Sequence, residues 1–193
     1  MRALRRIATV VALAFGVFGA TALQASTVAQ MNLEQMVTNS ERVFVGTIID
    51  VTESRRQIGG GEVPAVTYKI RVSDTFKGDF EEIKGELYTE VTMLGSLKHL
   101  AAGRHPITDF PMLAIGGEYL LMVAPAGPIG LTATMGVGQG CFTLSGDESD
   151  KVALNGANNV GLFSGMQVGF TGGEPISYGA LSSLINDIVG GAE

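Results

Sequence analysis

The sequence is poor in cysteine, and this shortage excludes several kinds of site. Cys141 is the only cysteine. The chain therefore cannot form an intrachain disulfide, or hold a cysteine-based zinc site or an iron–sulfur cluster by itself. Cys141 lies in an apolar stretch, which predicts a small buried hydrophobic residue and not a reactive thiol.

Basic residues are also scarce, with 13 Lys and Arg against 19 Asp and Glu. Residues 1–25 hold three of the arginines and no acidic residue, so the chain from residue 26 onward keeps 10 basic residues and a formal charge of −9. Binding to nucleic acid or to an anionic membrane surface requires a basic face. We therefore expect neither of them as a partner.

The common catalytic motifs are missing as well. The sequence contains no Gly-x-Ser-x-Gly elbow, no His-Glu-x-x-His zinc motif and no Walker phosphate loop. The glycine-rich run 136–140 resembles part of a dinucleotide fingerprint, but Cys141 stands where the third glycine is required, so we interpret the run as a turn or bulge. Asp147, Glu148 and Asp150 lack the longer alternating pattern of a calcium loop, and we interpret them as a solvated turn.

The pattern at the start of the sequence is typical of an export signal. A start with three arginines is followed by an apolar run over residues 7–22 and by small residues suited to cleavage after Ala22 or Ala25. The purely apolar part is shorter than the roughly 20 residues that cross a bilayer, which favours a cleaved signal over an anchor. We predict a signal peptide over residues 1–25 and an exported domain, periplasmic or extracellular and not inserted in a membrane, over residues 26–193.

The sequence of residues 26–193 predicts a single, mainly β domain. Residues 66–73 show clear apolar–polar alternation, and residues 43–51 are apolar on both faces, as in a central strand. Residues 53–63 are polar, contain three glycines and predict a flexible hairpin loop. Further strands are expected over residues 86–93, 118–123, 131–137, 141–145 and 151–154.

Two helices are expected at the ends of this domain. Residues 31–40 predict a short helix capped by Asn32, with Leu33, Met36 and Val37 on one face. After Ser177, a natural N-cap, an amphipathic C-terminal helix is expected to end at the glycine pair 190–191. Its apolar stripe consists of Leu181, Leu184, Ile185, Ile188 and Val189.

The segment 94–117 is the longest without a predicted element, and loops of this length often carry function. It contains His99, His105 and Asp109. Two imidazoles and a carboxylate can bind zinc, and the histidines are the only candidates for acid–base catalysis near neutral pH. Their spacing matches no regular helix or strand, so we interpret them as solvated loop residues. No catalytic, cofactor-binding or metal-binding residue is assigned, and no cofactor is expected.

A further observation concerns the order of four segments, residues 31–37, 43–51, 67–78 and 116–123. Together they resemble exported bacterial domains related to the tissue-inhibitor-of-metalloproteinase, or netrin-like, OB-fold group. The similarity covers residues 33–123, with an echo at 137–142. It implies a five-stranded OB-like antiparallel β-barrel, closed or partly closed, with an added C-terminal helix. The animal inhibitors chelate zinc through a cysteine at the mature N-terminus. Here that terminus lies near Ser26 and the only cysteine is Cys141, so the resemblance transfers neither that mechanism nor any site residue.

These observations favour an exported, non-enzymatic binding or protein-interaction domain. Its expected partner is another exported protein, and the loop 94–117 is the expected contact surface. Two alternatives stay open at this point. One is a metal-assisted hydrolase that uses His99, His105 and Asp109, and the other is a structural envelope protein. Fold alone does not distinguish among the three.

Overall fold

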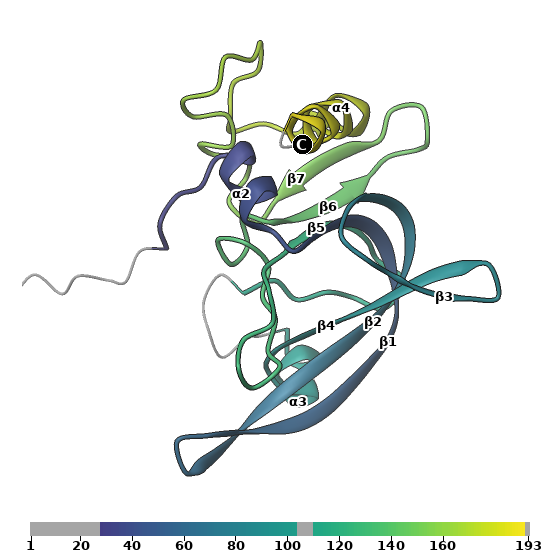
Figure 1. The fold of residues 1–193 in the computed structure, drawn as a ribbon, viewed down its shortest axis with the longest axis vertical. Helices are drawn as coiled ribbons and strands as arrows, with labels where there is room; N and C mark the ends of the chain where they lie inside the picture. The colour runs from purple at the N-terminus through teal and green to yellow at the C-terminus, as the bar shows by residue number, and fades with distance from the viewer. Residues whose placement is uncertain (1–27, 104–109, 192–193) are drawn as a thin grey trace, which may run out of the picture.

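The structure is a computed structural model that describes residues 28–103 and 110–191. The predicted signal peptide lies outside these ranges. Within them, eight strands form one antiparallel sheet in the order β3-β4-β2-β1-β5-β6-β7-β8 (Figure 1). The strands are β1 (Arg42–Ile58), β2 (Gly61–Lys77), β3 (Glu81–Ile83), β4 (Glu86–Leu94), β5 (Glu118–Val123), β6 (Cys141–Ser145), β7 (Val152–Asn155) and β8 (Ile176–Ser177).

The mainly β prediction is confirmed, and the sheet is open in the described part of the chain. Strand pairing ends at β3 on one edge and at β8 on the other. Three helices are described as well: α2 (Leu33–Asn39), α3 (Leu97–Ala101) and α4 (Tyr178–Gly190). None of the described helices is long and apolar enough to cross a bilayer.

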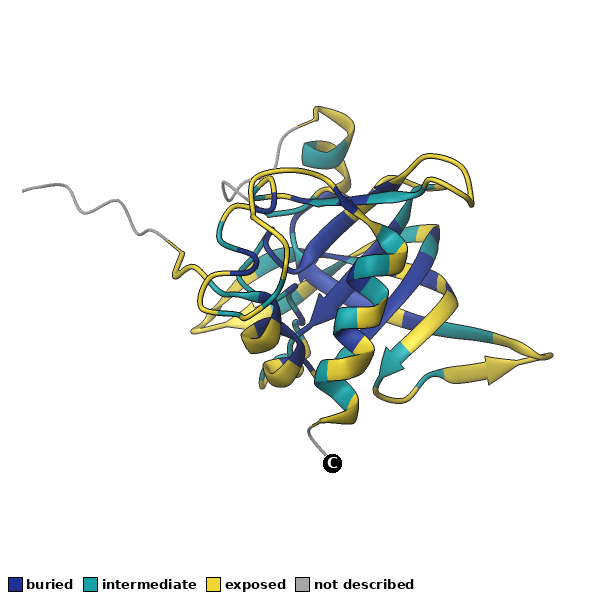
Figure 2. Cartoon of the chain, turned by 90° about the horizontal axis from the view of Figure 1, so that it is seen from above, coloured by how far each residue is buried: buried dark blue, intermediate teal, exposed yellow. Residues whose placement is uncertain are grey.

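β1 is apolar on both faces because it separates two cores, as the prediction of a central strand requires. Val43 and Val45 pack into a core with α2 and α4, called here the helix-side core. Phe44 and Ile48 belong to a second core, which takes residues from β1, β2, β4, β5, β6 and the loop 94–117 and is called here the enclosed core. Figure 2 shows α4 lying across the buried strands with its exposed face outward.

Both predicted helices are confirmed, and the predicted cap of α2 is confirmed as well. The Asn32 side chain accepts a hydrogen bond from the Gln35 amide at 2.9 Å, and Gln35 Oε1 accepts one from the Asn32 amide at 3.0 Å, which is a capping box. Lys77 Nζ donates to two carbonyls of the last turn of α2, at 3.0 and 2.8 Å. In α4, Leu181 and Ile185 are fully buried, although the Ser177 side chain makes no capping bond.

The predicted loop at residues 53–63 is wrong, although the hairpin is present. β1 and β2 continue through this segment in register, from Thr52 opposite Thr67 to Ile58 opposite Gly61. The turn is only Gly59–Gly60, whose φ angles of 55° and 85° are the left-handed values that a two-residue hairpin turn requires. The segment is polar because the ribbon projects from the sheet and most of its residues are exposed (Figure 1).

The predicted strand at residues 131–137 is wrong too. Only Thr134 forms an isolated bridge, with Val123. Thr132 is buried, and its amide donates to Thr92 O, near the end of β4, at 2.7 Å. Three elements were not predicted, namely the short strands β3 and β8 and the helix α3, which lies inside the expected loop 94–117. The glycine-rich run 136–140 is a turn, as interpreted from the sequence.

Candidate interaction surface and cavity

Hydrogen bonds join the described parts of the loop 94–117 to one stretch of β1. The amide of Leu97, at the start of α3, donates to Glu53 Oε2 at 2.7 Å. On the other side, the Gly116 amide donates to Ile48 O at 2.8 Å, and the Ile48 amide donates to Gly117 O at 3.1 Å. These bonds fix both ends of the loop against residues 48–53 of β1.

Four large apolar side chains are exposed around this stretch, and we call them the loop surface: Ile49, Leu97, Met112 and Ile115. Ile115 is 66% exposed, and the other three are exposed by 40–43%. Single exposed apolar residues are ordinary on protein surfaces, but these four all come from the loop or from the stretch of β1 that holds its ends. Leu100 and Leu113, from the same loop, pack into the enclosed core and hold the loop in place.

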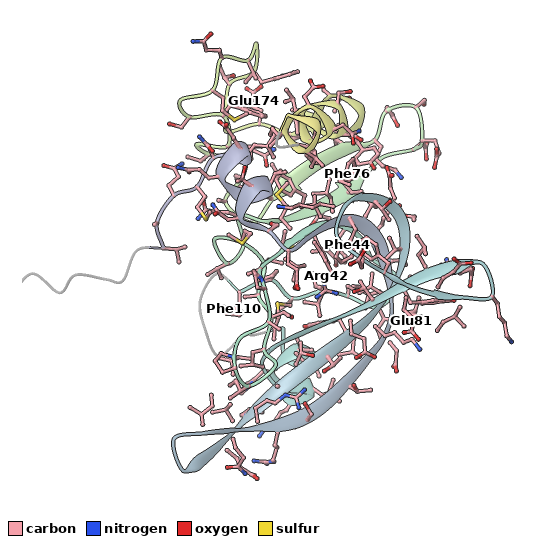
Figure 3. The ribbon with its side chains drawn as sticks, in the orientation of Figure 1. Arg42, Phe44, Phe76, Glu81, Phe110 and Glu174 are labelled. Carbon is pink, nitrogen blue, oxygen red and sulfur yellow. The ribbon has the colours of Figure 1, made fainter. Side chains whose placement is uncertain are left out.

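A cavity of about 250 Å³ opens beside the loop surface, and we call it the loop cavity. Met112 belongs to both. The cavity is formed by the second half of the loop, which begins at Phe110 (labelled in Figure 3), together with β5, β6 and two glycine-containing turns. Its lining consists of Phe110, Pro111, Met112, Leu113, Tyr119, Gly138, Cys141, Thr143 and Gly156.

Three groups that can form hydrogen bonds gather where the loop cavity meets the enclosed core. The Tyr119 hydroxyl accepts a hydrogen bond from the Ala114 amide at 3.0 Å. Burial raises the pKa of the Cys141 thiol to about 12. Burial also raises the pKa of Tyr68 to about 12, against a smaller opposite effect of the Leu113 backbone. The Tyr68 hydroxyl is buried and has no hydrogen-bond partner of normal geometry.

No protein-family model matches this chain, and no curated protein matches it. The chemistry of its own side chains is therefore the guide to what it binds.

Of the three residues considered for a metal site, the described ranges contain only His99. Its Nδ1 lies 2.8 Å from the Ser96 hydroxyl, which also caps α3, so this ring nitrogen is engaged within the loop. His105 and Asp109 lie outside the described residues. Across residues 28–103 and 110–191, no group of three or more His, Cys, Asp or Glu side chains could hold a metal ion.

The structure also describes the acidic turn at residues 147–150. The Asp147 amide donates to Asp150 Oδ1 at 2.8 Å. Glu148 is fully exposed at 4.0 Å from Lys151, which agrees with a solvated turn.

Two polar clefts could not be predicted from the sequence, because the residues that line each of them are far apart in the chain. In one, of about 270 Å³, Lys151 Nζ lies 2.9 Å from Glu118 Oε2, and the Tyr178 hydroxyl donates to Asp74 Oδ2 at 2.6 Å. Burial, and then the bond to Asp74, raise the pKa of Tyr178. The bond of Tyr178 connects the start of α4 to β2, and the ion pair of Lys151 connects the residue before β7 to β5.

The other cleft, of about 330 Å³, is lined by Arg42 from β1, Glu81 from β3 and residues of β2 and β4 (Figure 3). Arg42 is only 15% exposed, and its guanidinium donates to the Thr89 hydroxyl and, at 3.2 Å, to Glu90 O. The arginine thus connects the start of β1 to β4. No local sequence pattern signals this contact, since it depends on how the sheet curls.

Proposed function

We propose that the protein is an exported, non-enzymatic domain that binds another exported protein through the loop surface. The observation that supports this most directly is the group of four exposed apolar side chains, held in place by bonds to β1. Burying such side chains against a partner yields about 25 cal/mol per Å² of apolar area, and Met is enriched at protein interfaces. The excess of acidic residues agrees with a protein partner and not with nucleic acid.

We also propose that the sheet is an OB-like, partly closed barrel, as the resemblance to the netrin-like group implies. Two hydrogen bonds link the end of β4 to the segment after β5. Besides the bond from the Thr132 amide to Thr92 O, the Thr92 amide donates to Thr132 Oγ1 at 2.8 Å. The enclosed core also supports a barrel interior, since it takes side chains from β1, β2, β4, β5 and β6.

The test of the binding proposal uses substitutions on and off the loop surface. The tagged mature protein is incubated with the exported fraction of its own cells, and bound proteins are identified by mass spectrometry. The affinity for the purified partner is then measured for Ile115→Ser and Met112→Ser. We expect each to weaken binding by about tenfold, because truncating a central apolar contact costs more than about 1 kcal/mol.

Ile58→Ser and Ile83→Ser are the matched controls, because these isoleucines are exposed by 44% and 37% but lie on the hairpin tip and on β3. Both controls should bind as the unmodified protein does. Unchanged affinity in both loop variants would contradict the proposal. Stoichiometric zinc in the purified protein would instead favour the hydrolase alternative.

A further inference from the structure

The outer part of β1 has one edge that no described strand covers. β5 pairs with β1 only as far as Thr47, and the last backbone bonds on this side are those of Ile48. Beyond them β1 continues to Ile58 and pairs, in the described part of the chain, with β2 alone. We propose that a second copy of this chain pairs antiparallel with this free edge, residues 51–57, about a two-fold axis at Ser54. This pairing is independent of the binding proposed for the loop surface.

The direction of the backbone groups along the free edge follows from Pro64 of β2, which lies opposite Arg55. The Pro64 carbonyl accepts a hydrogen bond from the Gly95 amide at 3.1 Å, so it points away from β1. Two residues directly opposite each other in an antiparallel pair either exchange backbone bonds or both point outward. The amide and carbonyl of Arg55 therefore point into the free edge, and by alternation those of Glu53 and Gln57 do so as well.

The opposite edge of the same hairpin is blocked, because Pro64 has no amide to donate and its carbonyl is used by Gly95. β4 pairs with β2 only from Ala65 onward, so the tip of the projecting ribbon is two strands wide (Figure 1). A two-stranded ribbon alone is marginally stable in water. A second copy on the β1 side makes this part of the sheet four strands wide.

Charge selects the register of this pairing. Symmetric pairing lets the outward-pointing residues of two copies face each other over most of the free edge when the axis lies at residue 53, 54 or 55. An axis at Glu53 places two glutamates opposite each other, and an axis at Arg55 places two arginines opposite each other. With the axis at Ser54, Glu53 of each copy faces Arg55 of the other. Opposite charges directly across an antiparallel pair are stabilising and like charges are destabilising, so the edge complements itself in this register.

Both charged groups are available for these pairs. Arg55 makes a long contact of 3.7 Å with Glu62, and its side chain is 64% exposed. Glu53 is exposed as well, and it uses one carboxylate oxygen, Oε2, to accept from the Leu97 amide at 2.7 Å. The second oxygen of Glu53 is left for Arg55 of the second copy.

Two polar atoms on the ribbon support the same register. Ser54 Oγ and Arg56 Nε are out of contact with water and have no hydrogen-bond partner in the structure of the single chain. Residues two apart in a strand share a face, so both side chains lie on one face of β1. In the proposed register Ser54 lies opposite Ser54 of the second copy, and Arg56 lies opposite its Thr52. Hydroxyl groups at these places supply the acceptors and donors that the two atoms lack.

The first test measures the mass of the mature protein by sedimentation equilibrium up to about 1 mM, the weak end of the affinity scale. We expect a dimer that dissociates on dilution. Glu53→Arg and Arg55→Glu each place like charges opposite each other and should weaken it by about tenfold or more. An equal mixture of the two variants should associate again, because each offers the charge that the other lacks. Arg71→Glu is the matched control, since Arg71 also lies 3.7 Å from a glutamate but away from the free edge.

A second test measures the register by cross-linking in a Cys141→Ala background. Ser54→Cys places two thiols opposite each other at the axis, where the Cα atoms of such a pair lie about 4.5 Å apart, within reach of a disulfide. Thr52→Cys is the control, because its two copies lie about 13 Å apart along the strands. Ser54→Cys should form a disulfide-linked dimer in air, and Thr52→Cys should not.

The cross-linking variants keep both charges of the free edge, so they decide even where a charge variant fails to fold. The proposal is overturned by a monomer at every concentration, by a mixture of folded charge variants that does not associate, or by equal cross-linking at positions 52 and 54.

Discussion

At the scale of single residues, two buried asparagines, Asn155 and Asn159, organise the segment between β7 and β8. The Asn155 amide donates to Asn159 Oδ1 at 2.9 Å, and the Asn159 amide donates to Asn155 Oδ1 at 2.7 Å. Asn159 Nδ2 also donates to Ala153 O at 3.1 Å and to Glu174 O at 2.8 Å. One side chain thus satisfies backbone groups on both sides of a long excursion of the chain.

Asn159→Gly tests this organising role. Glycine keeps the left-handed backbone, since Asn159 has a φ of 57°, but loses three hydrogen bonds made by the side chain. We expect a loss of about 2–4 kcal/mol in the free energy of unfolding, measured by urea denaturation. The matched control is Asn158→Gly, because Asn158 has a φ of 53° but is exposed. Its effect should stay within about 0.5 kcal/mol, and equal losses in the two variants would contradict the role assigned to Asn159.

The buried thiol predicts a loss of stability in alkaline solution. The pKa of Cys141 rises from 9.0 to about 12 on folding, so the folded protein holds the thiol proton more tightly than the unfolded chain. Its contribution is therefore complete below pH 9 and is lost as the pH rises towards 12. We expect the free energy of unfolding to begin to fall near pH 9 in the unmodified protein.

In Cys141→Ala the part of this fall that begins near pH 9 should be absent. The decline due to Tyr68, whose pKa rises from 10.0 to about 12, should remain and begin near pH 10. Identical profiles for the two proteins between pH 8 and 10 would show that the thiol does not titrate in this way.

At the scale of elements, Gly46 allows β1 to lie very close to β2. A Cβ atom at this position would lie 2.6 Å from Ile70 Cγ2 and 2.7 Å from Arg71 O, both on β2. Only a residue without a side chain allows the two strands to approach so closely, and the pairing of β1 with β2 shifts register beside it, between Val45 and Gly46.

Gly46→Ala should therefore destabilise the protein by about 2–3 kcal/mol, because the carbonyl of Arg71 belongs to the backbone and cannot rotate away. The control is Gly169→Ala, since no heavy atom lies within 4 Å of a Cβ placed at that position. It should change the denaturation midpoint little. A similar shift in both variants would mean that strand approach at Gly46 is not constrained.

The sequence predicts those elements whose pattern is local. The stripe of α4, the capping residue of α2 and the strands 118–123 and 141–145 follow from periodicity and from single capping side chains, and the structure confirms them. The hairpin extension of β1 was missed because a ribbon whose residues are mostly exposed has the composition of a loop.

The candidate site was predictable only in part, for a related reason. The sequence identifies the loop 94–117 but not the bonds that hold its ends, which are made with Glu53 and Ile48 of β1. These residues are distant from the loop in the chain, and no spacing rule connects them to it. His105 and Asp109 lie outside the described residues, so the metal alternative stays a prediction.

At the scale of the whole molecule, the proposed export fixes where the working chain begins. The first described residues are held to the domain, since the Met31 amide donates to Gln139 Oε1 at 2.9 Å and Gln139 Nε2 donates to Ala29 O at 3.0 Å. Cleavage after Ala22 or Ala25 leaves both bonds intact. A cut beyond residue 28 would remove part of the folded domain.

We therefore expect N-terminal sequencing of the exported protein to begin at Leu23 or Ser26. Leu13→Arg, which places a charge in the apolar run of the signal, should keep the full-length precursor inside the cell, while Leu13→Ile should be exported normally. An exported protein that retains Met1 would contradict the proposed cleavage.

The contact between the first and the last described helix has a consequence for the order of synthesis. α2 and α4 pack together in the helix-side core, although they stand at opposite ends of the described chain (Figure 1). A chain that is still leaving the ribosome, or still threading through a pore, has no α4 to cover Leu33, Met36 and Val37. The helix-side core can therefore close only after α4 has been synthesised, whereas the enclosed core takes no residue from α4.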